Sequence, residues 1–154
     1  MLKIIGFFVI AACLLSSAAA SAEENKDIGV IVIDEITKKE CGACHLPFGP
    51  INLPARSWQK IMANLEKHFG ENAGLDEPTR KHVEDYMVGK SMDSGLTNYG
   101  KITSKKLGDK TYIRISGTPS WARHHDERHV TPEEWKKVKS KSDCRACHRP
   151  GIGG

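Results

Sequence analysis

The sequence contains little of the apolar material from which a protein core is usually built. Aromatic residues make up 6% of its 154 residues, whereas charged residues make up 27%. A chain of this length with few large apolar side chains buries too little surface to form an extensive core by itself. We therefore expect part of the core to come from something other than polypeptide.

The sequence also lacks a strong charge and a run long enough to span a membrane. The formal net charge is +4, which is too small for the basic surface of a nucleic-acid-binding protein. The apolar run at residues 4–15 follows Lys3 and precedes small residues that end at Ala22. This layout is typical of a secretory signal peptide rather than of a membrane helix. We predict a cleaved signal peptide at residues 1–22 and a mature chain that is not membrane-embedded.

Cysteine is scarce, and all cysteines beyond the signal peptide have the same surroundings. Of the five, Cys13 lies within the predicted signal peptide. The other four belong to two copies of a CxxCH motif, at residues 41–45 and residues 144–148. No thiol of the mature chain is left over for a disulfide framework.

The CxxCH motif is typical of covalent c-type haem attachment. Residues i, i+3 and i+4 of a helical turn share one face, so the two thiols and the imidazole can reach the same porphyrin edge. The thiols then form thioethers with the haem vinyl groups, and the imidazole binds the iron. The predicted attachment residues are Cys41, Cys44, Cys144 and Cys147, and the predicted iron ligands are His45 and His148.

Zinc and disulfide bonds are the alternatives for these cysteines. Two CxxC pairs can supply four thiolates to a tetrahedral zinc site, and paired thiols can oxidise in an exported protein. A histidine directly after both pairs is unexplained by zinc, and the signal peptide places the chain where haem is attached. We therefore predict two haem c groups, which would also supply the missing core.

The second axial position of each iron decides between an electron carrier, an oxygen binder and a peroxidase. Apolar spacing after Ser57 predicts a helix capped by that residue and extending to Phe69, with His68 at the edge of its apolar face. This position makes His68 the best candidate. In the stretch 121–129, at least one histidine must be a ligand if the second iron is six-coordinate. The available side chains are His68, His82, His124, His125, His129, Met62, Met87 and Met92.

Further helix signals lie on both sides of the middle of the chain. Asp76 and Pro78 predict the start of a helix that continues to Gly89. Thr131 opens a capping box with proline at the first helical position, which predicts a short helix before the second motif. Prolines in residues 46–54 exclude a regular helix there.

Strand signals are weak and confined to two short runs. Residues 29–33 predict an edge strand or an extended segment, and residues 111–115 predict part of a short hairpin. We therefore expect a mainly α fold, a small diheme c-type cytochrome with two haem-binding lobes and few or very short strands. The predicted parts are a signal peptide at 1–22, an N-terminal haem lobe at 23–89, a connecting segment at 90–117 and a C-terminal haem lobe at 118–154.

Several longer strings extend the similarity beyond the haem motifs. Together they resemble the bacterial diheme cytochrome c (DHC) family over nearly the whole mature chain. The strings are residues 41–45, 53–58, 68–73, 118–121, 125–127, Trp135 and residues 144–148.

The resemblance implies a periplasmic electron-transfer protein, not an enzyme, with two bis-histidine haems. It implies that His68 and His125 are the ligands opposite the motif histidines. It also implies redox partners, such as a monohaem oxygen-binding cytochrome or a membrane b-type cytochrome. The chain is longer than the family pattern between His125 and Trp135, and His124 and His129 remain alternatives for the second distal ligand.

Two other functions remain open on the sequence. A diheme subunit of a periplasmic oxidoreductase would also carry two motifs, although they would be expected closer together. A peroxidase or a sensor of oxygen or nitric oxide would have one five-coordinate iron.

Overall fold

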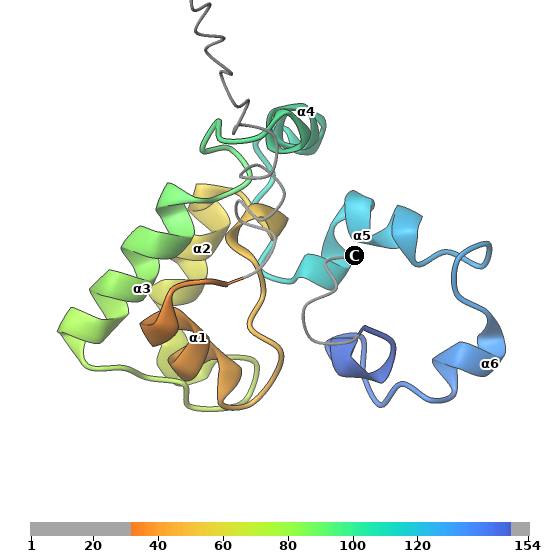
Figure 1. Cartoon of the computed structure of the whole chain (residues 1–154), viewed down its shortest axis with the longest axis horizontal. Coiled ribbons are helices and arrows are strands. Elements are labelled where there is room, and N and C mark those ends of the chain that lie inside the picture. The colour runs from red at the N-terminus through yellow and green to blue at the C-terminus, as the bar shows by residue number, and fades with distance from the viewer. Residues whose placement is uncertain (1–31, 149–154) are drawn as a thin grey trace, which may run out of the picture.

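The computed structural model describes residues 32–148, and it is built from helices joined by irregular segments (Figure 1). The predicted signal peptide, most of the β-rich run at residues 29–33 and the tail beyond residue 148 lie outside the described residues. Within residues 32–148 there is no sheet, only an isolated bridge between His68 and Glu71. This confirms a mainly α fold. The helices are α1 (Glu35–Gly42), α2 (Ala55–Met62), α3 (Glu77–Gly89), α4 (Asn98–Leu107), α5 (Pro119–His124) and α6 (Pro132–Trp135).

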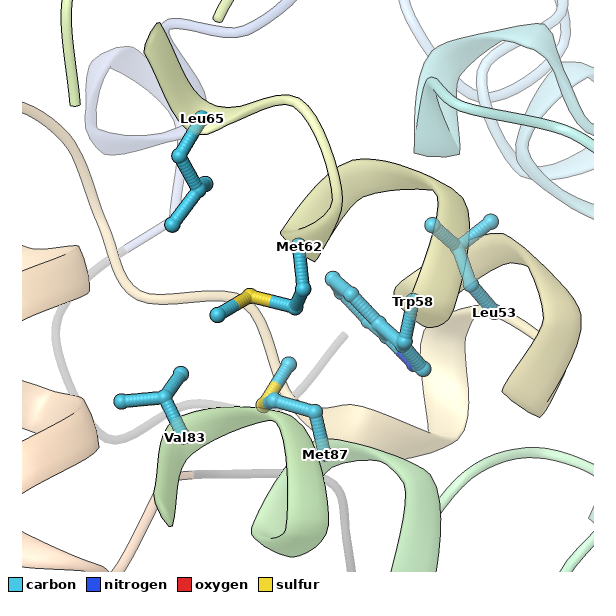
Figure 2. Close-up of a cluster of buried hydrophobic side chains, with 6 residues drawn as sticks. All are labelled: Leu53, Trp58, Met62, Leu65, Val83 and Met87. Carbon is cyan, nitrogen blue, oxygen red and sulfur yellow. The ribbon is translucent and has the colours of Figure 1, made fainter. Parts of the chain in front are cut away.

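Helices α2 and α3 pack against each other, and α1 packs against α3, on one side of the molecule (Figure 1). Trp58 and Met62 of α2 face Val83 and Met87 of α3, each pair being four residues apart on one side of its helix (Figure 2). Burying one such side chain contributes roughly 1.5–3 kcal/mol. The complete cluster is Leu53, Trp58, Met62, Leu65, Val83 and Met87.

Helix α3 follows the prediction from its local signals. The side chain of Asp76 accepts a hydrogen bond from the backbone N–H of Thr79 at 3.0 Å, and Pro78 lies in the first turn. Asp76 thus satisfies one free donor at the start of the helix, and Pro78 has no N–H that needs a partner. The predicted start and end of this helix are confirmed.

Helix α2 is shorter than predicted and begins earlier. It starts at Ala55 after Pro54, and Ser57 is a fully buried residue inside the helix rather than its N-cap. The helix ends at Met62 because Asn64 has a non-helical backbone conformation. A 3-10 helix at Leu65–Lys67 follows, so His68 does not lie on the same helix as Trp58.

The predicted hairpin near residues 111–115 is wrong. The preceding segment forms α4, whose start is capped by the side chain of Thr97. The residues after α4 have no partner strand, and their backbone carbonyls are used elsewhere. Arg56 of α2 donates hydrogen bonds to the carbonyl oxygens of Gly108 and Lys110. The β-formers of residues 111–115 therefore form no ladder, and Ile115 begins a 3-10 helix that ends at Gly117.

The C-terminal part consists of short helices. The capping box at Thr131 forms as predicted, with reciprocal hydrogen bonds to Glu134. Helix α6 is a single turn that ends at Trp135. Among residues 32–148, no helix is long and apolar enough to cross a membrane.

Candidate functional site

His45 and His68 lie side by side although they come from different elements. His45 follows α1, and His68 follows the 3-10 helix at Leu65–Lys67. Their ring centroids are 6.2 Å apart, with an angle of 23° between the ring planes. A metal–imidazole bond is about 2 Å long and the centroid lies about 1 Å farther, so two imidazoles on opposite sides of one metal have centroids roughly 6 Å apart. The pair has the spacing of two axial ligands of one iron.

The His45 ring is oriented by its own loop. Its Nδ1 lies 2.7 Å from the carbonyl oxygen of Leu46, to which it can donate a hydrogen bond. This hydrogen bond leaves Nε2 as the nitrogen available for a metal. The Phe48 ring stacks on His45 with a centroid distance of 4.9 Å. Cys41 lies in α1 and Cys44 just beyond it, so the first motif occupies a helix end and the following turn.

The surroundings of His68 combine apolar and basic side chains. A hollow beside it is lined by Phe69 and Ile113, which are 44% and 42% exposed. These apolar side chains provide a surface that a porphyrin can cover. Phe69 has a positive φ of 55°, a conformation that costs energy for a bulky residue and is concentrated at functional sites. The Arg114 guanidinium lies 3.9 Å from the centre of the Phe69 ring.

Burial lowers the pKa of His68, and the charges of His45 and Arg114 lower it further. At neutral pH this imidazole is therefore neutral, which is the form that binds a metal. Burial also raises the pKa of the Cys41 thiol to about 11, with a contribution from Glu40, and burial raises the pKa of Cys144.

The four cysteines do not converge on one tetrahedral site. Within residues 32–148, no group of three or more His, Cys, Asp or Glu side chains is arranged to hold a metal ion. The geometry therefore gives no support to the zinc alternative. It agrees instead with two separate attachment sites, each with its own histidine pair.

The second site pairs His125 with His148. Their ring centroids are 5.9 Å apart, with 55° between the planes, which again fits two ligands of one iron. The second motif begins in a 3-10 helix at Cys144–Ala146, and the backbone N–H of His148 donates a hydrogen bond to the carbonyl oxygen of Cys144 at 2.7 Å. This helical turn is the arrangement expected from the spacing of the motif.

His125 is held by Trp121, which lies one turn earlier in α5. The two rings are stacked, with centroids 4.3 Å apart and planes 9° from parallel. The Nδ1 of His125 lies 2.9 Å from the carbonyl oxygen of Trp121, which accepts its hydrogen bond. Trp135 closes another side of the His125 ring, at 6.4 Å between centroids. Sequence reasoning assigned no role to Trp121, although its four-residue spacing from His125 on a short helix is a signal for this contact.

The alternative distal ligands lie elsewhere. The His124 ring faces His129, with centroids 6.4 Å apart, and Nδ1 of His129 bonds to Asp126. His82 pairs with Asp34 at the surface, at 3.0 Å. The three candidate methionines, Met62, Met87 and Met92, are buried in the protein.

Comparisons with known proteins gave a family match and similar solved structures. A model of the dihaem cytochrome c family matches residues 37–152. A search of curated proteins gave no match. Among solved structures, a diheme cytochrome c from Rhodobacter sphaeroides is similar at 41% identity and a TM-score of 0.70, covering 77% of this chain and 92% of that one.

A second similar structure is the diheme c-type cytochrome sb-DHC from Shewanella baltica OS155. It is 32% identical to this chain, with a TM-score of 0.54, and the match covers 74% of this chain and 79% of that one. In each of these two comparisons, the similarity extends over most of this chain and most of the solved structure.

Proposed function

The chain belongs to the dihaem cytochrome c family, which binds two covalently attached haem c groups, and on this premise we propose that it is a periplasmic electron carrier with two bis-histidine haems. Haem c supplies an iron that takes up and releases one electron at a time. We assign the first haem to the lobe at residues 23–89 and the second to the lobe at residues 118–154. This assignment uses Cys41, Cys44, Cys144 and Cys147 for attachment.

The observation that carries the proposal is the spacing of the two histidine pairs. His45 with His68, and His125 with His148, each leave room for one iron between their rings. Two imidazoles per iron fill both axial positions, so neither site keeps a vacancy for a substrate. Imidazole ligation also favours a lower reduction potential than a His/Met pair. These features favour a carrier over a peroxidase or a gas sensor.

The family and the predicted signal peptide together favour a periplasmic location for the protein and redox proteins as its partners. Proteins with c-type haem are typically exported, which agrees with the predicted signal peptide at residues 1–22. We infer that the mature chain begins at Glu23 in the periplasm and exchanges electrons with redox proteins there. A monohaem oxygen-binding cytochrome and a membrane b-type cytochrome are the candidate partners. Mass spectrometry of the protein from a periplasmic extract tests the cleavage site and the number of haems together.

Spectroscopy of ligand variants tests the axial assignments. The pyridine haemochrome of the purified protein should give two haems per chain, and both irons should be low-spin. In His68→Ala one haem should become high-spin and bind carbon monoxide, and His125→Ala should do the same at the other haem. The matched controls are His82→Ala and His124→Ala, which should leave both irons low-spin.

Other outcomes would contradict the proposal in recognisable ways. Fewer than two haems per chain would exclude a two-haem carrier. Rapid carbon monoxide binding by the unaltered protein would favour the peroxidase or sensor. A high-spin iron in His124→Ala, with none in His125→Ala, would move the distal ligand to His124.

A further inference from the structure

Helix α4 has one buried side, and its remaining residues are exposed or partly exposed. A side chain at Gly100 would collide with the carbonyl oxygen of Met92, so α4 packs directly against the backbone of the segment that contains Met92. Just beyond its end, Arg56 donates hydrogen bonds to the carbonyl oxygens of Gly108 and Lys110. The outer face of α4 therefore has a fixed orientation. Its buried residues are Gly100, Thr103 and Leu107.

Three apolar side chains are exposed along this helix. Leu96, just before α4, is 46% exposed, while Tyr99 and Ile102 are 51% and 57% exposed. They are spaced three residues apart, so the two helical residues lie on one side of α4. Single exposed apolar residues are ordinary on a protein surface, but neighbouring ones mark sites of interaction.

Three lysines lie on the same helix as two of these apolar residues, and two of the lysines, Lys105 and Lys106, follow Ile102 by three and four residues. Lys101, Lys105 and Lys106 are exposed on α4, and none of them belongs to an ion pair formed within residues 32–148. Their positive charges are therefore available to a partner. An apolar centre with a charged rim is the usual composition of a transient protein interface. We call Leu96, Tyr99, Ile102, Lys101, Lys105 and Lys106 the α4 surface.

The α4 surface is connected to the second site. The Tyr99 hydroxyl lies within hydrogen-bond distance of the Ser120 hydroxyl in α5, at 3.1 Å. Trp121 follows Ser120 and stacks on His125. A partner seated on α4 would therefore be linked to His125, the proposed ligand of the second haem, through one hydrogen bond and a single turn of chain.

We propose that the α4 surface is the docking site of an acidic redox protein that exchanges electrons with the second haem, which rests on the function proposed above. In each exchange, one electron leaves the reduced protein and reduces one ferric iron of the other, with no transfer of atoms. The lysines attract an acidic surface and accelerate encounter, and the apolar centre holds the complex together. A second copy of this chain would bring its own three lysines against these, so charge disfavours self-association here.

Charge reversal with a matched control tests the docking site. The probe is a reduced, acidic plant-type ferredoxin, whose low reduction potential allows it to reduce a bis-histidine haem. Its reaction with the haem-loaded protein is followed by anaerobic stopped flow at several salt concentrations. The test variant is Lys101→Glu/Lys105→Glu, and the control is Lys137→Glu/Lys139→Glu, which makes the same change in net charge elsewhere.

We expect the rate constant of the α4 variant to be about tenfold or more below that of the unaltered protein at low salt, and to lose most of its salt dependence. The rate constant of the control variant should stay within about twofold of that of the unaltered protein. An equal loss in both variants, or no loss in either, would overturn the docking site. Unchanged spectra and full reduction of all three proteins by dithionite would show that the carrier function stands independently of this result.

Two further measurements exclude other occupants of the α4 surface. Sedimentation of the unaltered protein and of Ile102→Glu should show monomers of the same size. A dimer that Ile102→Glu dissociates would assign the surface to a second copy. A chain lacking residues 23–31 should react with ferredoxin at the unaltered rate, and a faster reaction would show that this segment covers the surface. Either result would overturn the proposal.

Discussion

Trp121 is the residue that most directly fixes the imidazole of His125. Its indole stacks on the imidazole, and its carbonyl oxygen accepts the Nδ1 hydrogen bond. Trp121→Leu keeps the carbonyl but removes the stacked ring, so the imidazole gains freedom to rotate about the iron bond. We expect both haems to remain bound, while the low-spin electron paramagnetic resonance signal of one haem broadens and its potential shifts by on the order of tens of millivolts.

Trp121→Phe is the matched control, because it restores an aromatic face against His125. A stacking role predicts that Phe returns the signal and the potential most of the way to the original values, whereas Leu does not. Spectroelectrochemical titration of both variants makes the comparison. If the two variants behave alike, the ring is needed for packing and not for the orientation of the imidazole.

The motif residues could be predicted from the sequence, because the CxxCH spacing itself encodes one attachment site. Local spacing only narrowed the distal ligands to candidates, with His68 the best of them, and the choice of His68 and His125 came from the family resemblance. His124, His125 and His129 all lie within residues 121–129, and the folded chain shows that the His125 ring lies beside His148. The contact between Arg114 and Phe69 could not be predicted, since it joins residues far apart in the sequence with no spacing signal.

Among the helices, α3 has a start that responds to pH. The backbone N–H of Thr79 donates a hydrogen bond to Asp76, and this bond holds the pKa of Asp76 below its ordinary value. Because the folded pKa is the lower one, the carboxylate stabilises the protein above about pH 4, and this contribution is lost as pH falls through the folded pKa. We expect Asp76→Ala to lower the melting temperature at pH 7, and the difference from the unaltered protein to shrink toward pH 3.

The variant Asp76→Asn keeps a side chain that can cap the helix but removes the negative charge. Asparagine accepts the same hydrogen bond but does not titrate in this range, so its melting temperature should stay above that of Asp76→Ala at every pH. Thermal denaturation followed by circular dichroism measures all three proteins between pH 3 and pH 7. A constant gap between Asp76→Ala and the unaltered protein across this range would contradict the role of the carboxylate.

Helices whose capping residues lie in the local sequence could be predicted, whereas helices that depend on tertiary contacts could not. Helices α3 and α6 carry their caps in the sequence, at Asp76 and Thr131. Helix α2 begins earlier than predicted because Pro54, not Ser57, precedes its first turn. Helix α4 was missed since Ser, Gly and Lys dominate that segment, and its formation depends on packing at Gly100, Thr103 and Leu107.

At the scale of the whole molecule, the polypeptide core is confined to one part of the chain. Within residues 32–148, every buried hydrophobic side chain lies between Val32 and Leu107. Helices α5 and α6 and the 3-10 helix at Cys144–Ala146 contain no buried residue. The C-terminal part therefore has the fewest buried apolar side chains, and we infer that it depends on its haem for a core.

Removing one attachment site at a time tests this division. In Cys144→Ala/Cys147→Ala the second haem has no covalent anchor, and we expect the amides of residues 119–148 to exchange hydrogen nearly as fast as in an unfolded chain. Helices α2 and α3 should stay protected, because Trp58, Met62, Val83 and Met87 pack together without the second haem. Hydrogen exchange read by mass spectrometry resolves the two regions.

The reciprocal variant, Cys41→Ala/Cys44→Ala, supplies the control. It removes the first anchor from the part of the chain that has its own apolar core, so α2 and α3 should lose only part of their protection. Residues 119–148 should remain protected, because their own haem is still attached. If the C-terminal residues keep their protection in Cys144→Ala/Cys147→Ala, side-chain packing alone holds that part together, and the haem is not its core.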